Sequence, residues 1–282
     1  MVSNKGMKRV TVILTCYNRC ERTIECIKTL KEGNPKVSLS FVVVDDNSAD
    51  DTKNKIYQLI NCGYDVVYIM GNGCLYWAGG MRVGIEYALN NTDSDYYLFV
   101  NDDVKFEYSV IQDMIDEYEE KRYKNCKALV GATYGENGML SYGGVNYLGR
   151  GVQHEIKGPD YRGKCDTFCM NCVFIDNNVF FKCGNFDSEY IHSLADYDYG
   201  LNISREIGCI YMFSRFVGKC DENSILGTWQ DPSLSIFKRL VLKEEEKGAP
   251  FGPWFHFLNK NFGLIKALIH SVKPYFRVIL GK

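Results

Sequence analysis

Short, strongly apolar segments alternate with helical segments through the first half of the chain, and this alternation constrains the fold more than any other feature. The strands are expected at Val10–Leu14, Leu39–Val44, Val66–Met70 and Tyr96–Val100. The helices that follow them are expected at Glu21–Lys31, Asp51–Asn61, Met81–Leu89 and Val110–Arg122. Repeated βα units of this kind predict a mostly parallel sheet with helices on both faces and right-handed crossovers. The sequence therefore predicts an α/β fold with a Rossmann-like central sheet.

From about Ala128 the pattern changes to strands separated by glycine-rich turns. Further strands are expected at Ala128–Thr133, Gly138–Tyr142 and Cys172–Ile175. We interpret this part as a mixed region that extends the same sheet and does not form a new core. Later helical segments are expected at Leu194–Glu206, with Gly208 just past its end, and at Leu234–Glu246 and Phe262–Leu280.

Size, charge and cysteine content exclude several classes of protein. With 282 residues the chain can bury a sizeable core. Its 33 basic and 35 acidic residues nearly cancel, so we expect no nucleic-acid partner. The 12 cysteines are scattered and no signal peptide is recognisable, which favours reduced thiols in the cytoplasm. Structural zinc on Cys165, Cys169, Cys172 and Cys183 is the less favoured alternative to thiols that pack in the core.

Two of the expected strands end in paired acids. Asp45-Asp46 follows the second strand, and Asp102-Asp103 follows the fourth. Open α/β sheets bind their ligands at the carboxyl ends of strands, and carboxylates are the ligands that Mg²⁺ and Mn²⁺ prefer. Helix capping explains Asp50 and Asp51 but does not explain the pair that precedes them. Because adjacent like charges repel unless a cation or a donor meets them, the two pairs indicate a site.

Motifs in four places, in the same order along the chain, resemble a known family. Thr15–Arg19 is similar to its "T-x-Y-N-R" opening, and Val44–Thr52 is similar to its "V-D-D-x-S-x-D-x-T" nucleotide-binding signature. Asn101–Asp103 stands where the family carries a D-x-D metal motif. Gly184–Asp187 and then Ala195–Leu201 resemble its later segment, which supplies a catalytic base. The chain thus resembles the family 2 glycosyltransferases, which have the GT-A fold.

The resemblance covers about Val10 to Gly208, and it implies three parts. These are a nucleotide-sugar-binding half at residues 1–125, an acceptor and catalytic half of the same domain at 126–230, and a C-terminal helical extension at 231–282. Gly227-Thr228-Trp229 and Lys273-Pro274-Tyr275 resemble a bacterial, rhamnosyltransferase-like subgroup used in surface-polysaccharide assembly.

The resemblance implies that Thr15, Tyr17 and Arg19 line a nucleotide pocket. Asp46 would accept a hydrogen bond from a pyrimidine N3–H, which uracil and thymine carry and cytosine lacks, so UDP or dTDP is expected. Arg82, at a helix start, would pair with the diphosphate. Trp77 fits a sugar platform and a buried turn residue equally well.

For the metal, the resemblance implies Mg²⁺ or Mn²⁺ on Asp103, bridging the diphosphate, with Asn101 toward the ribose and Asp102 in support. Asn101 replaces the first Asp of the D-x-D motif. No late histidine ligand occurs at residues 216–220, where Lys219 either contacts a phosphate or lies on the surface.

Asp196 is the candidate general base, which would remove the proton of an acceptor hydroxyl in an inverting transfer. Helix capping is the competing interpretation of this aspartate. Asp198 would point elsewhere, because residues i and i+2 of a helix do not share a face. His192, just upstream, could shape the acceptor pocket.

These residues lead to one function and two alternatives. We expect an inverting transferase that moves a hexose or deoxyhexose from a UDP- or dTDP-sugar to a hydroxyl of a growing bacterial glycan, with a lipid-linked acceptor as one option. The alternatives are a nucleotidyltransferase, although Thr15–Arg19 lacks the glycines of its phosphate loop, and an inactive nucleotide-sugar-binding scaffold. We expect a cytoplasmic location. The helix that includes Phe262–Lys273 is expected to pack on the domain, with peripheral contact to the inner face of the plasma membrane as the alternative.

Overall fold

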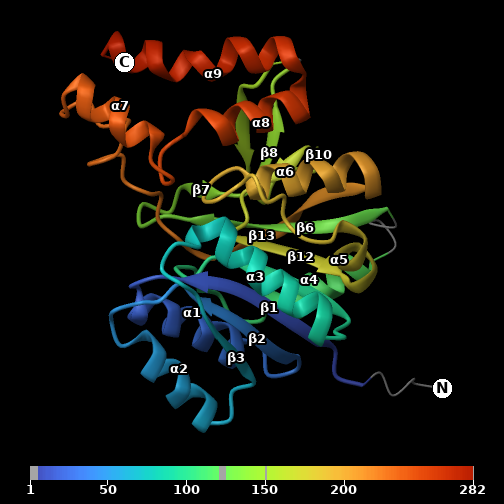
Figure 1. The fold of residues 1–282 in the computed structure, drawn as a ribbon. Coiled ribbons are helices and arrows are strands. Elements are labelled where there is room, and N and C mark those ends of the chain that lie inside the picture. Colours follow the sequence, from blue (N-terminus) through green and yellow to red (C-terminus); the bar gives the residue numbers. More distant parts are fainter. Residues whose placement is uncertain (1–5, 121–124, 150, 282) are drawn as a thin grey trace.

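The computed structural model describes residues 6–120, 125–149 and 151–281, and Figure 1 shows its arrangement. The first half contains β1 (Arg9–Cys16), α1 (Cys20–Gly33), β2 (Ser38–Asp45), α2 (Thr52–Asn61), β3 (Val66–Met70), α3 (Tyr76–Asn91), β4 (Tyr96–Val100), β5 (Lys105–Phe106) and α4 (Val110–Glu119). Next come β6 (Cys126–Tyr134), β7 (Leu140–Tyr142), β8 (Gly144–Tyr147), β9 (His154–Lys157), β10 (Lys164–Cys165), β11 (Thr167–Phe168) and β12 (Cys172–Asp176). The last part contains α5 (Asn177–Cys183), α6 (Ala195–Asn202), the π-helix η2 (Ile203–Ile207), β13 (Cys209–Lys219), α7 (Ile236–Glu244), α8 (Phe251–Phe262) and α9 (Leu264–Ile279).

A ten-stranded mixed sheet runs through the molecule in the order β10-β13-β6-β12-β4-β1-β2-β3. The two remaining strands are β5, which pairs with β13, and β7, which pairs with β6. Strands β1, β2, β3 and β4 are mutually parallel, and β13 runs parallel to β6. Strand β12 lies between β4 and β6 and is antiparallel to both. The carboxyl ends of β1, β2, β4 and β6 therefore meet at one edge, where ligands of α/β sheets bind. The predicted α/β class, with a mixed, mostly parallel sheet, is confirmed.

Helices cover both faces of the sheet, because its strands are apolar on both sides (Figure 1). On one face α1, α2 and α4 bury residues such as Ile27, Ile56 and Met114. On the other face α3, α5, α6 and α8 bury residues such as Ile85 and Phe257. The prediction that the second half extends the same sheet is confirmed, because β13, β6 and β12 lie side by side in this sheet and β12 pairs with β4.

The strands predicted at Val66–Met70 and Tyr96–Val100 have the predicted bounds, but the third helix begins earlier than predicted. Helix α3 starts at Tyr76, within a glycine-rich segment that indicated a loop. Those glycines are needed inside the helix because α3 packs directly on β1. A Cβ atom on Gly84 would lie 2.8 Å from the Ile13 Cγ2 atom, and one on Gly80 would collide with the Thr15 side chain.

Several elements of the second half were not predicted. Strand β13 was missed because its pairing with β6 is interrupted by register shifts, which break the period-two pattern. Helix α8 was missed because glycine, proline and aromatic residues open it. Pro253 is tolerated there because backbone N–H groups in the first turn of a helix have no acceptor within the helix, so the missing N–H of proline costs no hydrogen bond. Residues 121 and 122 of the predicted fourth helix lie outside the described residues.

Helices α7, α8 and α9 gather at one end of the molecule, opposite α1 and α2 (Figure 1). Helix α8 packs on the second-face core through Phe257 and Leu258, and α9 packs on α8. Among residues 6–120, 125–149 and 151–281, no helix has the length and apolar content that crossing a membrane requires. All twelve cysteines are free thiols, and Cys172 is fully buried with its sulfur 4.0 Å from that of Met114.

Candidate active site at the carboxyl edge of the sheet

The loops that follow β1 and β2 are held together by the polar residues of their motifs. The Asn18 amide oxygen accepts a hydrogen bond from the Ala49 backbone N–H at 2.7 Å, and the Ser48 hydroxyl accepts one from the Asn18 N–H at 2.8 Å. Asp50 accepts hydrogen bonds from backbone N–H groups at the starts of both α1 and α2. Asp45 is buried and accepts hydrogen bonds from Ser48 and from a tyrosine of β3. These four polar residues stabilise the two loops.

Asp46, by contrast, reaches across to the loop between β3 and α3. Its carboxylate accepts backbone hydrogen bonds from Gly73 at 2.8 Å, from Leu75 at 2.9 Å and from Tyr76 at 2.9 Å. Tyr76 has a φ of 54°, a strained conformation that these bonds help to maintain. The predicted contact of Asp46 with a pyrimidine ring stays a prediction, and the structure adds a role in shaping the wall of the cavity.

Two adjoining cavities open at this edge of the sheet. The first has a volume of about 420 Å³, and the second about 690 Å³. The first is lined by Thr15, Cys16, Tyr17, Arg19, Asp46, Gly73, Tyr76, Trp77, Asp102, His192, Glu245, Glu246 and Lys247. The predicted catalytic and metal residues, Asp196 and Asp103, line the second cavity together with Asn101. Arg19, Trp77, Asp102, His192 and Lys247 line both cavities, so the two belong to one site.

Arg19 lies beside both acids that follow β4. One guanidinium nitrogen is 2.8 Å from an Asp103 oxygen and 3.5 Å from an Asp102 oxygen. Asp102 is buried and also accepts a hydrogen bond from Thr23 at 3.0 Å. Burial, and then the charge of Asp103, raise the pKa of Asp102 to about 7, against the opposing effect of Arg19. Asp102 therefore keeps its proton up to nearly neutral pH, mainly because it is buried.

This donor set fits a divalent cation that is shared with a substrate. Within the part of the chain that the structure describes, no group of three His, Cys, Asp or Glu residues could hold an ion by itself. Mg²⁺ is usually bound by one or two carboxylates together with substrate phosphates. Asp103 and Asp102 could supply such carboxylates. Cys220 donates a weak hydrogen bond to Asp103 at 3.5 Å.

Trp77 and Asn101 form a pair between the two cavities. The Trp77 indole N–H donates to the Asn101 amide oxygen at 2.9 Å. The Trp77 ring packs against Phe186 with a centroid distance of 5.9 Å. The tryptophan is therefore half-buried and held in place, with part of its ring facing the site.

Arg82 and Lys219 lie away from both cavities. The Arg82 guanidinium donates to the backbone oxygens of Tyr190 at 3.0 Å and Asp187 at 3.4 Å, and so supports the loop before α6. The Lys219 ammonium is 3.1 Å from Glu136. In this geometry Arg82 is engaged with the backbone, and its predicted contact with a diphosphate stays a prediction.

Asp196 lies in the first turn of α6 and lines the second cavity. It is not the N-cap, which is Leu194, a residue with a φ of 76°. Its carboxylate accepts a hydrogen bond from its neighbour Tyr197 at 2.9 Å and a long one from Met170 at 3.4 Å. Burial raises its pKa to about 6. Asp198 points elsewhere, as predicted, and is bound by residues of α8.

The segment between α7 and α8 lines the first cavity, and sequence reasoning missed it. The sequence placed Glu245 and Glu246 in a predicted helix at Leu234–Glu246 and gave no role to Lys247, whereas α7 ends at Glu244. The Lys247 ammonium lies 5.9 Å from the centre of the Tyr17 ring. The facing His192 has a buried Nδ1 without a hydrogen-bond partner among the described residues. Burial, and then Lys247 and Arg19, lower the pKa of His192 to about 4, so its imidazole is neutral.

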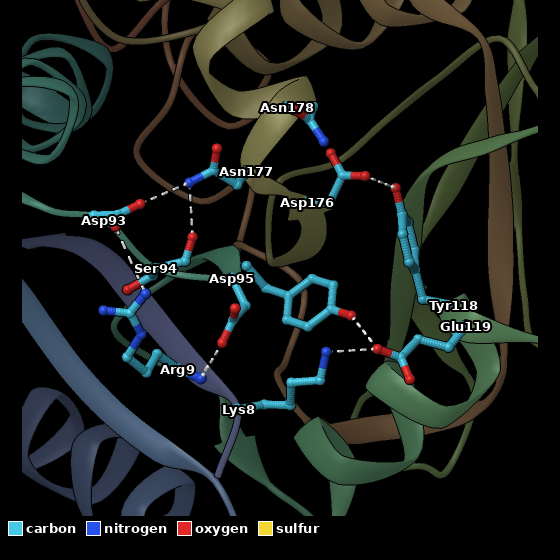
Figure 2. A pocket seen from close by; sticks show the side chains of 11 residues that line it. Lys8, Arg9, Asp93, Ser94, Asp95, Tyr118, Glu119, Asp176, Asn177 and Asn178 are labelled. Atoms are coloured by element: carbon cyan, nitrogen blue, oxygen red, sulfur yellow. Dashed lines mark hydrogen bonds and ion pairs between the residues drawn. The ribbon is translucent and has the colours of Figure 1, made fainter. Parts of the chain in front are cut away.

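A further cavity, of about 680 Å³, lies at the opposite edge of the sheet (Figure 2). Its charged groups bind one another: Lys8 lies 2.8 Å from Glu119, and the Tyr118 hydroxyl donates to Asp176 at 3.0 Å (Figure 2). It contains none of the motif residues and lies at the amino ends of β1 and β4. We therefore take the pair of cavities at the carboxyl edge as the candidate active site.

Comparisons with known proteins identify the family of the chain. The model of the family described as glycosyl transferase family 2 matches residues 11–180. No curated protein matches the chain.

Among solved structures, the mannosyltransferase PcManGT from Pyrobaculum calidifontis, in complex with GDP-Man and Mn²⁺, has a TM-score of 0.56 at 12% identity. That alignment covers 97% of this chain and 74% of the other. S. aureus TarS 1–349 in complex with UDP-GlcNAc has a TM-score of 0.61 at 16% identity, covering 96% and 82% of the two chains. At these identities the likeness concerns the fold.

The raised pKa of Asp102 leads to a test by pH. In the unfolded chain this carboxyl ionises near its ordinary value, whereas in the folded protein it keeps its proton up to about pH 7. The folded state then binds more protons, so this group lowers stability as pH rises from about 4 to about 7. Asp102→Asn should therefore gain about 2–6 °C in melting temperature over the native protein between pH 5 and pH 8. Asp160→Asn, at an exposed carboxyl, is the control. An equal difference at both pH values would contradict the assignment.

Proposed function

The chain belongs to glycosyl transferase family 2, and from that premise we propose that it transfers a hexose or deoxyhexose from UDP or dTDP to a hydroxyl of a growing glycan, with inversion at the anomeric carbon. The protein is a glycosyltransferase, and the proposal concerns its donor, acceptor and mechanism. The observation that carries it is the shared wall of the two cavities. Arg19, Trp77 and Asp102 line both cavities and so connect the first cavity, with its predicted nucleotide residues, to the cavity that Asp196 lines.

The first cavity suits a nucleoside diphosphate. Tyr17 is 46% exposed at its mouth, where a base could lie against the ring. Asp46 supplies a carboxylate at the same wall, and a carboxylate accepts the N3–H of uracil or thymine. Arg19 and Lys247 supply two cations that can contact a diphosphate, and a divalent cation would offset the four acids of the same lining.

A divalent Mg²⁺ or Mn²⁺ bound with the donor would neutralise the charge that builds on the leaving diphosphate. Asp103 would hold it, with Asp102 in support. Arg19 already binds both carboxylates, and it lines both cavities, so its guanidinium can stabilise the same leaving group. Lys219 is paired with Glu136 and lies away from the cavities. We propose that Lys247, from the C-terminal part of the chain, is the lysine that contacts the diphosphate.

Asp196 would act as the general base. As the acceptor oxygen attacks the anomeric carbon, its proton passes to the Asp196 carboxylate, and the bond from the sugar to the phosphate oxygen breaks. A single displacement of this kind inverts the configuration. A base with a pKa of about 6 is ionised at neutral pH and still a useful proton acceptor. His192, which lines the same cavity, is neutral and does not compete for the proton.

The second cavity suits a carbohydrate acceptor. Aromatic residues of β8 and α8 line it, among them Tyr147, Trp254 and Phe262. Sugar rings pack their apolar faces on such side chains. In its specific form, the proposal places the protein in the cytoplasm, in a rhamnosyltransferase-like subgroup that assembles bacterial surface polysaccharide. A lipid-linked acceptor is part of that proposal.

A nucleotide panel tests the donor site. We expect UDP or dTDP to raise the melting temperature by several degrees in the presence of Mn²⁺ or Mg²⁺, and GDP and CDP to act less, because binding to the native state stabilises it by about 2.7 kcal/mol at 100 times Kd. The effect should be smaller in EDTA, and Asp103→Ala should lose the metal-dependent part. Asp160→Ala is the matched control. If no nucleotide changes the melting temperature under any condition, the donor site is wrongly assigned or inactive.

Replacement of the base tests the mechanism. Asp196→Asn should lower kcat by about 10²–10⁴-fold while the response to the donor nucleotide persists. The native rate should fall as pH drops below about 6, because the carboxyl is then protonated. Glu189→Gln, at an exposed acid nearby, is the control for charge alone. A variant that retains the native rate would exclude Asp196 as the base.

Replacement of Lys247 tests its proposed contact with the diphosphate. Lys247→Ala should raise the Kd of the nucleoside diphosphate about tenfold, the effect of losing one charge-assisted contact. Binding of the uncharged nucleoside should change little. Lys238→Ala, at an exposed lysine of α7, is the control. If the variant lost affinity equally for the nucleoside and for the nucleoside diphosphate, Lys247 would contact the base or the ribose and not the phosphates.

A further inference from the structure

Helix α9 packs on the domain with a narrow stripe and leaves most of its surface uncovered. Its buried residues are Ala267, Ser271 and Val278, which share one face of the helix. The sequence suggested that this helix either packs on the domain or contacts a membrane. The structure shows that the fully buried contact is limited to this stripe, to which Tyr275 adds a hydrogen bond to α7.

A broad apolar face of α9 is exposed. Its members are between 40% (Val272) and 75% (Ile265) exposed. The face comprises Leu264, Ile265, Leu268, Ile269, Val272, Phe276, Ile279 and, just beyond the helix, Leu280. At the α-helical spacing of about 100° per residue, these eight side chains fall in one sector about 160° wide. Isolated exposed apolar residues are ordinary, but a contiguous face of this size marks an interaction surface.

A third sector of α9 is basic. Lys266, Lys273 and Arg277 lie between the exposed apolar face and the packed stripe, with His270 beside them. The helix contains no aspartate or glutamate. An exposed apolar face bordered by lysine and arginine, without acids, is typical of helices that lie in a membrane interface.

We propose that α9 docks the protein on an anionic lipid surface, with its apolar face toward the acyl chains and Lys266, Lys273 and Arg277 toward the headgroups. Charge decides between this occupant and a second copy of the chain. Two α9 helices that paired through this face would bring their basic sectors together with no acid from either helix to compensate. Anionic headgroups supply that charge.

The docking surface is rigidly connected to the site. The Tyr275 hydroxyl of α9 donates to Glu244 at 2.6 Å, and the buried Lys243 donates to the Ala249 backbone oxygen at 2.7 Å. These bonds fix α9 to the segment that carries Lys247. Helix α8, on which α9 packs, supplies Trp254 and Phe257 to the wall of the second cavity. Resting on the proposed function, the inference therefore selects a lipid-linked acceptor, presented at the bilayer surface.

Vesicle flotation of the full chain tests the docking. The native protein should bind vesicles of phosphatidylglycerol and phosphatidylcholine about tenfold more strongly than vesicles of phosphatidylcholine alone, and less strongly as salt rises. The double variant Ile265→Ser, Ile269→Ser should lose about tenfold or more in binding to either vesicle. The variant Lys273→Glu, Arg277→Glu should lose the preference for the anionic vesicle.

Met139→Ser, at a side chain 66% exposed on the turn after β6, is the control and should bind as the native protein does. Because the changed side chains are exposed, all variants should keep the native melting temperature. Failure of the native protein to float with anionic vesicles would overturn the proposal. So would a native dimer that the double variant at Ile265 and Ile269 converts to a monomer, since the face would then belong to a second copy. Flotation needs no nucleotide, so its result is independent of the donor panel.

Discussion

The organisation of this protein depends on how it accommodates acids at the carboxyl edge of one sheet. Asp45, Asp46, Asp102 and Asp103 all lie there, and their mutual repulsion must be offset by donors. Asp46 is met by three backbone N–H groups of the loop before α3, and Asp102 by Thr23 and Arg19. Because Asp46 binds the loop before α3 while Asp102 and Asp103 bind Arg19 of the loop after β1, the acids also hold the walls of the candidate site together. Asp103 is met by the charge of Arg19 and by a weak hydrogen bond from Cys220, which leaves it suited to a cation that arrives with a substrate.

The C-terminal extension completes the site. Lys260 of α8 lies between Asp187 and Asp198, at 2.8 Å and 2.7 Å, and His256 lies 3.0 Å from Asp187. Although burial opposes it, the hydrogen bonds from Lys260 and His256 lower the pKa of Asp187 to about 2. These contacts tie α8 to the helix that carries Asp196. The same extension delivers Lys247 to the first cavity and aromatic side chains to the second.

Backbone strain is concentrated around the site. Five described residues other than glycine have positive φ values, and four of them border the cavities or support their walls: Asn18, Asn47, Tyr76 and Leu194. The fifth, Ser109, precedes α4. Such conformations persist only where the surrounding contacts hold them. Here the contacts are the hydrogen bonds between loops, such as that from the Tyr76 N–H to Asp46. The site is therefore built before any ligand binds, which reduces the entropic cost of binding.

The sequence by itself determined the βα architecture, the acid pairs at the strand ends and the position of Asp196 at the start of a helix. Each of these is a local pattern: a period of apolar residues, or a polar residue directly after a strand. Only the tertiary structure decided that Lys247 and His192 line the first cavity, that Arg82 supports a backbone loop, and that α9 exposes its apolar face. It also decided the pKa of Asp196, which burial beneath distant segments raises. These features depend on which surfaces remain after packing, and packing brings together residues more than a hundred positions apart, where a local pattern carries no information.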